Sequence, residues 1–416
     1  MKEYLFNLWE KVKKSSVKFK ILLTFLILLY VGIICVSTIQ LEVDATTPGS
    51  ITNVNNVIDI DSENLKGSIY TVSVFTKSDV SILQYLLMKL DKNTEIELGK
   101  SITYDIFTQN EEYLSNVAYK NQSIQDSIIV AYNKAISEGY NVVLDYAYKG
   151  QNVLNIPQNL YKTGSEDIKN NDIIIGYQGV KFTCEQDYSL ALDDIFSNVY
   201  YENNQSIKDL KVNNQLNLTD SNGNKINENI KLVIDIYNKL KDSENKFQLS
   251  IIRDKEEKTI NASFKMLFYL YTGYIFKEDK IYTSKINNFT AYTINYDKCS
   301  PKIKLNEATT VGPSGGLLQT LAVYNAITEE DITKGLKIMG TGGISIDGTA
   351  TIIGGEQQKI ITAVLYSADI FFIPEENYAS AKVKYDTLKE PPYKLVSVKT
   401  FDDVIDYLKN MEDTNE

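Results

Sequence analysis

The chain has 416 residues, a net charge of −11 and no histidine. Such an acidic chain is unsuited to nucleic acid, whose binding depends on neutralising phosphates. With three cysteines and no histidine, the common zinc ligand sets are excluded. A hydrophobic content of 43% indicates folded domains rather than a long disordered stalk.

The N-terminus contains a segment that is long and apolar enough to cross a membrane. Residues 21–39 form an uncharged apolar run that would extend roughly 28 Å as a helix, close to the thickness of a bilayer core. Residues 1–20 carry six lysines and two glutamates, and lysine-rich flanks stay in the cytoplasm. We expect a cytoplasmic tail at 1–20, a single transmembrane helix at 21–39 in the cell membrane, and an extracellular remainder. A cleaved signal peptide is the alternative, although its apolar region usually has about 7 to 15 residues.

Residues 40–138 are predicted to form a mixed α/β region next to the membrane. Residues 41–65 are rich in Asp, Asn and Thr and contain a Pro-Gly pair, which indicates a short linker. Residues 69–75 alternate as a strand, and apolar residues recur at helical spacing in 80–90 and 124–136.

Residues 139–267 have the pattern of a divergent PDZ-like domain with an insertion near 180–228. A buried strand is expected at 172–179, an amphipathic helix at 229–241 and a β-hairpin at 247–264. This order is similar to the second half of a PDZ domain, which binds peptides by strand addition. Residues 220–224 have some features of a calcium loop but lack its turn glycine, so a hairpin turn is favoured.

Residues 268–416 form the last predicted unit, a compact α/β domain. The expected order is strands rich in Tyr and Ile up to Leu305, a helix at 314–327, a glycine-rich strand pair at 338–353, a helix at 356–367, a strand at 369–373 and a helix at 401–411. The predicted fold class is therefore α+β behind a transmembrane helix.

Ser314 begins one of these helices, in the segment Gly-Pro-Ser-Gly-Gly. Free backbone N–H groups at a helix start can hold an oxyanion. Serine is also a preferred N-cap residue, so most Pro-Ser helix starts are purely structural. Glycines 315 and 316 favour a functional interpretation, because glycine in a first turn costs roughly 0.5 to 1 kcal/mol and indicates that another group approaches closely.

Lys359 lies in the first turn of the helix predicted at 356–367. Without histidine, only a lysine or a carboxylate is left to activate a serine hydroxyl. A lysine taken at random is usually a solvated surface residue. To act as a base at pH 7 it must be neutral, which costs roughly 4.6 kcal/mol from a reference pKa of about 10.4. The helix N-terminus helps, but only burial lowers a lysine pKa by several units. The catalytic interpretation therefore requires Lys359 to be buried.

These motifs resemble the proteolytic domain of Lon-type serine proteases with a Ser/Lys dyad. The matching segments are Gly312-Pro313-Ser314-Gly315-Gly316, Gly340-Thr341-Gly342, Asp347-Gly348 and Ile353-Gly354-Gly355 before Lys359. In its order of segments the whole chain resembles the membrane-anchored PDZ–Lon proteases of Gram-positive bacteria. There are two departures: Gly315 stands where the family usually has alanine, and Gly343 stands where ATP-dependent Lon enzymes often have an acidic residue.

The resemblance implies a role for each site residue. Ser314 would be the nucleophile, Lys359 the general base and Thr341 the residue that orients the lysine amine. The backbone N–H groups of Gly312 and Ser314 would hold the oxyanion.

The implied function is an ATP-independent, membrane-anchored serine endopeptidase that cleaves extracytoplasmic peptides or unfolded protein segments. Gly99-Lys100-Ser101 lacks the spacing of a nucleotide-binding P-loop. We expect a peptide or unfolded protein substrate and the membrane, through 21–39, as partners. We expect no nucleic acid, nucleotide, metal or cofactor, and oligomerisation stays open. The alternative is a non-catalytic surface protein that keeps the PDZ-like and Lon-like domains for peptide binding.

Overall fold

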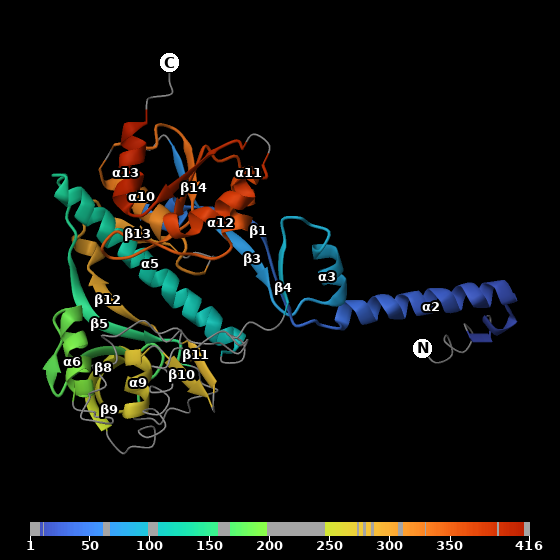
Figure 1. The fold of residues 1–416 in the computed structure, drawn as a ribbon, viewed down its shortest axis with the longest axis horizontal. Coiled ribbons are helices and arrows are strands. Elements are labelled where there is room, and N and C mark those ends of the chain that lie inside the picture. The colour runs from blue at the N-terminus through green and yellow to red at the C-terminus, as the bar shows by residue number, and fades with distance from the viewer. Residues whose placement is uncertain are drawn as a thin grey trace.

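A computed structural model describes residues 9–10, 12–60, 67–98, 107–156, 167–197, 246–272, 274–277, 280–283, 287–306, 311–328, 330–388 and 391–411. Helix α2 (Val17–Thr38) projects away from the rest of the protein (Figure 1). It has 22 residues, is predominantly apolar after Lys18 and Lys20 near its start, and has no buried side chain. By length and composition it is a candidate membrane span, at the position expected from the sequence.

The main sheet has six strands in the order β18-β17-β14-β3-β1-β4. The bounds are β1 (Val43–Asn53), β3 (Ser68–Lys77), β4 (Glu95–Leu98), β14 (Lys337–Gly340), β17 (Ile370–Pro374) and β18 (Lys394–Val398). Strands β3, β14, β17 and β18 are parallel to one another, whereas β1 is antiparallel to both β3 and β4. Strands from the two ends of the chain therefore meet in the middle of one sheet.

Helices cover both faces of this sheet. The bounds are α5 (Gln109–Ser137), α10 (Gly316–Ile327) and α13 (Phe401–Asn410) on one face, and α11 (Glu356–Leu365) and α12 (Glu375–Tyr385) on the other. Strand β17 shows the division, because Ile370 and Phe372 join the core beneath α10 while Phe371 and Ile373 join the core beneath α11. The alternation of a strand thus gives a three-layer arrangement.

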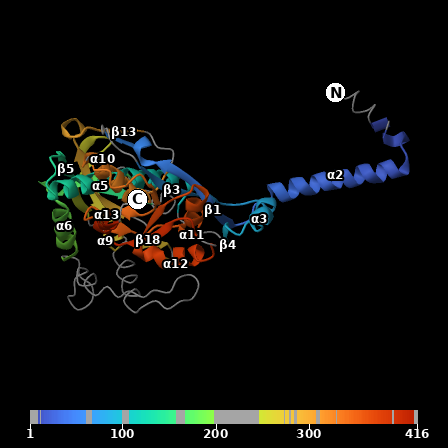
Figure 2. The same ribbon diagram turned by 90° about the horizontal axis from the view of Figure 1, so that it is seen from above.

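Strands from the middle of the chain form a second sheet. Its order is β12-β5-β6-β8-β9, with β7 paired to β6, and every pairing is antiparallel. The bounds are β5 (Tyr146–Leu154), β6 (Ile173–Tyr177), β7 (Val180–Lys181), β8 (Lys246–Arg253), β9 (Glu256–Ser263) and β12 (Asn287–Ile294). Helices α6 (Glu185–Ser197) and α9 (Phe264–Thr272) share its apolar core. Figure 2 shows the same elements from above.

Short elements complete the described fold. They are η1 (Val54–Asn56), β2 (Ile58–Ile60), α3 (Ile82–Met88), β10 (Tyr274–Lys277), β11 (Lys280–Thr283), η3 (Tyr296–Lys298), β13 (Ile303–Leu305), β15 (Gly343–Ile344) and β16 (Ala350–Thr351). The α+β class expected from the sequence is confirmed, in that helices and several sheets are combined in one fold.

Several local expectations differ from the structure. The segment expected as a linker contains β1, an eleven-residue strand inside the main sheet. The first residues of the segment expected as Tyr- and Ile-rich strands, up to Thr272, belong to helix α9, and the strands β10 to β13 follow them up to Leu305. Helix α12 was not expected. The predicted helix at 229–241 and the loop at 220–224 lie outside the described residues. The PDZ-like domain and the domain boundaries remain predictions.

Candidate active site

Ser314 lies in a tight turn just before helix α10. The turn is shaped by Gly312, whose φ of 94° is in the region that favours glycine. Helix α5 holds this turn at two points, because Gly312 N–H donates to the Asn116 carbonyl oxygen (3.0 Å) and the Ser123 hydroxyl donates to the Pro313 carbonyl oxygen (3.0 Å). The helix itself starts at Gly316, so Ser314 precedes it by two residues.

The structure also explains the glycine at 316. A Cβ at this position would lie 2.5 Å from Ser123 Oγ and 2.9 Å from the Ile344 backbone nitrogen. The close approach expected from the sequence therefore comes from α5 and β15, which pack against the first turn of α10.

Lys359 is buried, as the catalytic interpretation requires. It lies in the first turn of α11 with 3% of its surface exposed. Its Nζ donates a hydrogen bond to Thr341 Oγ1 at 3.0 Å. Burial lowers the pKa of Lys359 to about 8, although the nearby carboxylate of Glu356 acts in the opposite direction. A substantial fraction of this amine is thus neutral in mildly alkaline solution.

Thr341 connects the lysine to the serine turn. Its hydroxyl accepts from Lys359 Nζ and donates to the Ser314 carbonyl oxygen at 3.1 Å. Gly342 N–H donates to the same carbonyl oxygen at 2.8 Å, and Thr341 N–H donates to the Phe372 carbonyl oxygen in β17. The fully buried Thr341 therefore fixes both Lys359 and Ser314 relative to the main sheet.

The fold brings Ser314, Thr341 and Lys359 close together, but Ser314 and Lys359 are connected indirectly, through Thr341. Among the described residues, no hydrogen bond joins the Ser314 hydroxyl to Lys359 Nζ, and the connection runs through Thr341. Gly312 N–H is already used by the Asn116 carbonyl oxygen, so it is not free to hold an oxyanion in this conformation. Within the same described ranges, Ser314 N–H has no hydrogen-bond partner.

A cavity of about 420 Å³ opens beside the serine turn. It is lined by Pro313 and Gly343 together with residues of α5, α6 and β12. Asp126 and Glu185 are its carboxylates. Neither was predicted from the sequence, because only the fold brings α5 and α6 next to the serine.

Comparison with known proteins supports the sequence motifs. Residues 280–410 match the Lon protease (S16) C-terminal proteolytic domain. The chain therefore carries a Lon-type proteolytic domain. Both Ser314 and Lys359 lie within the matched residues, and so does Thr341.

Individual Lon proteases match shorter parts of this domain. The chain is 41% identical over 66 residues to the Lon protease of Aster yellows witches'-broom phytoplasma, covering 16% of this chain and 8% of that protein. It is 32% identical over 93 residues to the Fusobacterium nucleatum Lon protease, covering 22% and 12%. The match to the Campylobacter concisus Lon protease is 29% over 94 residues, covering 23% and 11%. The chain thus spans only about a tenth of the length of these relatives.

The sheet and core that contain the matched residues also include segments from upstream in the chain. Strands β1 and β3 belong to the same sheet as β14, β17 and β18, and α5 packs against α10. Ser123 and Asn116, which hold the serine turn, come from α5. Part of the support for the candidate site therefore comes from residues far upstream of the match.

Proposed function

We propose that this protein is a membrane-anchored serine endopeptidase that works without ATP, with Ser314 as nucleophile and Lys359 as general base. The observation that carries the proposal is the buried Lys359 amine, held by Thr341 within a Lon-type domain. A lysine with a pKa of about 8 is close to the operating range of an efficient general base.

The hydrogen bonds of Thr341 to Lys359 and to the Ser314 turn support the proposed reaction. In that reaction the Ser314 hydroxyl turns toward neutral Lys359, which accepts the proton as Oγ attacks the peptide carbonyl. Ser314 N–H holds the oxyanion, and Gly312 N–H joins it only if its bond to Asn116 opens. Protonated Lys359 then gives its proton to the leaving amine of the peptide. Neutral Lys359 next activates a water molecule, which hydrolyses the acyl-enzyme.

Cleavage of casein, an unstructured substrate, by the purified full-length protein tests this function. Ser314→Ala and Lys359→Ala should abolish cleavage, whereas Ser397→Ala and Lys394→Ala, which change exposed residues on β18, should not. Equal activity in the wild type and the two site variants would contradict the proposed dyad. A wild type that cleaves neither casein nor a range of peptides would instead favour the non-catalytic binding protein.

ATP independence has its own measurement. The rate of casein cleavage should be the same with and without Mg-ATP. A large stimulation by ATP would contradict this part of the proposal and leave the dyad unaffected.

The proposed topology places the catalytic domain outside the cell, with α2 as anchor. Cys184 is free and exposed, whereas Cys299 is buried and Cys35 lies within α2. A membrane-impermeant maleimide should therefore label Cys184 in intact cells, and Cys184→Ser should remove the label. Labelling only after cell lysis would contradict the outward orientation.

We also propose that residues 139–267 act as a peptide-binding module next to the catalytic domain. Five strands of the six-stranded antiparallel sheet, β5 to β9, lie in this part of the chain, and β9 ends the strand order, where a peptide strand would add. Removing the module's peptide affinity should raise KM for long substrates and leave KM for short peptides unchanged.

A further inference from the structure

The cavity beside the serine turn is placed to receive a side chain of the substrate. Pro313 immediately precedes Ser314, and Gly343 follows the residue whose N–H donates to the Ser314 carbonyl oxygen. A peptide whose scissile bond reaches Ser314 would therefore have side chains close to this cavity. Its volume of about 420 Å³ is within the range of about 300 to 1,000 Å³ that is typical of small-ligand sites.

The cavity contains a carboxylate without a cationic partner among the described residues. Asp126 Oδ1 accepts from Gln122 Nε2 at 2.8 Å, and the same amide donates to the Thr290 carbonyl oxygen at 2.9 Å. Gln122 thus bridges α5 and β12 and orients Asp126. Burial raises the pKa of Asp126 to about 7, against the opposing effect of the Gln122 hydrogen bond. An approaching cation would favour the charged form.

The rest of the lining matches a cation as well. Glu185, the exposed first residue of α6, contributes a second carboxylate. Burial raises the pKa of Tyr292 to about 12, and the negative charges of Glu185 and Asp126 raise it further. Both carboxylates therefore act on the part of the cavity that Tyr292 lines. Tyr119 and Phe289 pack edge to face with ring centroids 4.8 Å apart. Aromatic rings beside carboxylates favour ammonium and guanidinium groups.

We infer that this cavity is a specificity subsite that selects a lysine or arginine side chain next to the scissile bond. The inference rests on the proposed peptidase function, because it uses Ser314 to place the scissile bond. The apolar stem of such a side chain would lie against the aromatic wall, and its charged end would reach Asp126 and Glu185.

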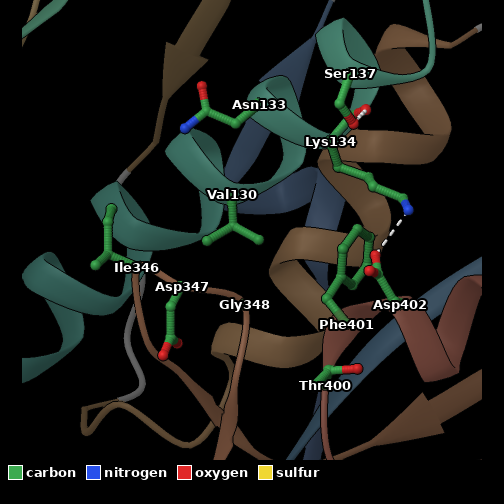
Figure 3. A pocket seen from close by; sticks show the side chains of 10 residues that line it. All are labelled: Val130, Asn133, Lys134, Ser137, Ile346, Asp347, Gly348, Thr400, Phe401 and Asp402. Atoms are coloured by element: carbon green, nitrogen blue, oxygen red, sulfur yellow. Dashed lines mark hydrogen bonds and ion pairs between the residues drawn. The ribbon is translucent and has the colours of Figure 1, made fainter.

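A neighbouring cavity shows what a less suitable site looks like. It has a volume of about 230 Å³ and lies beyond Ile346, which lines both cavities (Figure 3). Its lysine is paired with one of its two carboxylates, because Lys134 Nζ lies 2.8 Å from Asp402 Oδ1. The other carboxylate, Asp347, accepts from Thr349 N–H at 2.9 Å and serves as a control outside the first cavity.

The test is the affinity of full-length Ser314→Ala for two unstructured peptides that differ only in lysine or norleucine at one position, scanned along the peptide. Norleucine keeps the apolar stem of lysine and removes the charge. At one position lysine should bind about tenfold or more tightly. Asp126→Asn should reduce this ratio to within about twofold, and Glu185→Gln should reduce it partly. Asp347→Asn, with the same charge change outside the cavity, should retain it.

Two results would overturn the inference. One is equal or tighter binding of norleucine at every position, which would assign the cavity to an apolar side chain. The other is a lysine preference that Asp126→Asn and Glu185→Gln both leave unchanged while circular dichroism shows the native fold. Because binding is measured in a variant that lacks the nucleophile, these results are independent of cleavage by the wild type. Cleavage without a lysine preference would therefore reject the subsite and keep the peptidase.

Discussion

Two regions of the molecule bury a positive charge in opposite ways. In the second sheet, Arg253 forms a two-point ion pair with Asp172: Nε donates to Oδ1 at 2.8 Å and a terminal nitrogen donates to Oδ2 at 2.6 Å. In the Lon-type domain, Lys359 has a neutral hydroxyl as its hydrogen-bond partner. Asp172 raises the pKa of Arg253, whereas burial lowers that of Lys359.

The difference shows that Arg253 is suited to a structural role and Lys359 to proton transfer. A paired charge stays fixed over the whole physiological pH range, so the Arg253 pair can only stabilise the fold. An unpaired buried amine can change its protonation state near neutral pH, which is what a general base needs. The following predictions test this contrast.

Replacing Lys359 by methionine should have the largest effect. Proteolysis should fall by a factor of about 10² to 10⁴ because the general base is lost. The free energy of unfolding at pH 7 should stay constant or increase by up to about 3 kcal/mol, because the cost of burying the amine is removed. Casein cleavage and urea unfolding measure the two effects. A less stable variant would show that Lys359 has a stabilising partner after all.

Replacing Asp172 by alanine should have the opposite pattern. The free energy of unfolding should fall by about 3 kcal/mol or more, because Arg253 loses both hydrogen bonds to the Asp172 carboxylate in a largely buried site. Asp386→Ala is the control, since it breaks an exposed ion pair with Lys382 and should leave the free energy of unfolding nearly unchanged. Similar urea midpoints for the two variants would contradict the structural role of the Arg253 pair.

Replacing Thr341 by valine should slow proteolysis by about tenfold to a hundredfold, because Lys359 and the Ser314 turn lose their common hydrogen-bond partner. The pH profile should move to lower pH, since the charged amine loses an acceptor. Thr341→Ser keeps the hydroxyl and should restore both the rate and the profile. An unshifted profile for Thr341→Val would mean that Thr341 acts only in packing.

The pH dependence of the wild type gives the smallest effect. With a pKa of about 8 for Lys359, the neutral fraction and hence kcat/KM should rise about fivefold from pH 7 to 8 and less than twofold from pH 8 to 9. Stability should follow the same sign. The folded pKa is below the unfolded value, so the wild type should gain stability relative to Lys359→Met as pH rises from 8 toward 10. A flat rate between pH 6 and 9 would contradict Lys359 as base.

Local patterns predicted much of the domain that carries the site. The helices α10 and α11 and the strand β17 were expected within a few residues, since each has a clear apolar period and glycine or proline at its ends. The burial of Lys359 followed from chemistry alone, because a base with an unshifted lysine pKa would be protonated.

The pairing of strands that lie far apart in the chain could not be predicted from the sequence. β1 contains Pro48 and Gly49 among polar residues and was expected as a linker, yet Gly49 N–H donates to the Thr362 hydroxyl of α11 and β1 pairs with β3 and β4. A bulge at this point, where the register shifts between Pro48 and Ile51, tolerates residues that would interrupt a regular strand. Similarly, Asp126 is an ordinary polar residue of a helix until α6 and β12 enclose it.

The connection between α2 and the main sheet is short and is held in place. α2 ends at Thr38 and β1 begins at Val43, and the residues between them are bonded to the start of α3, through Leu41 N–H to the Val80 carbonyl oxygen and Ile82 N–H to the Ile39 carbonyl oxygen. Even fully extended, such a segment would reach about 14 Å. With α2 in a bilayer, Ser314 could therefore reach substrates only within a thin layer above the lipid. Substrates held in the same membrane would meet it by lateral diffusion at a high effective concentration, whereas free peptides would first have to enter that layer.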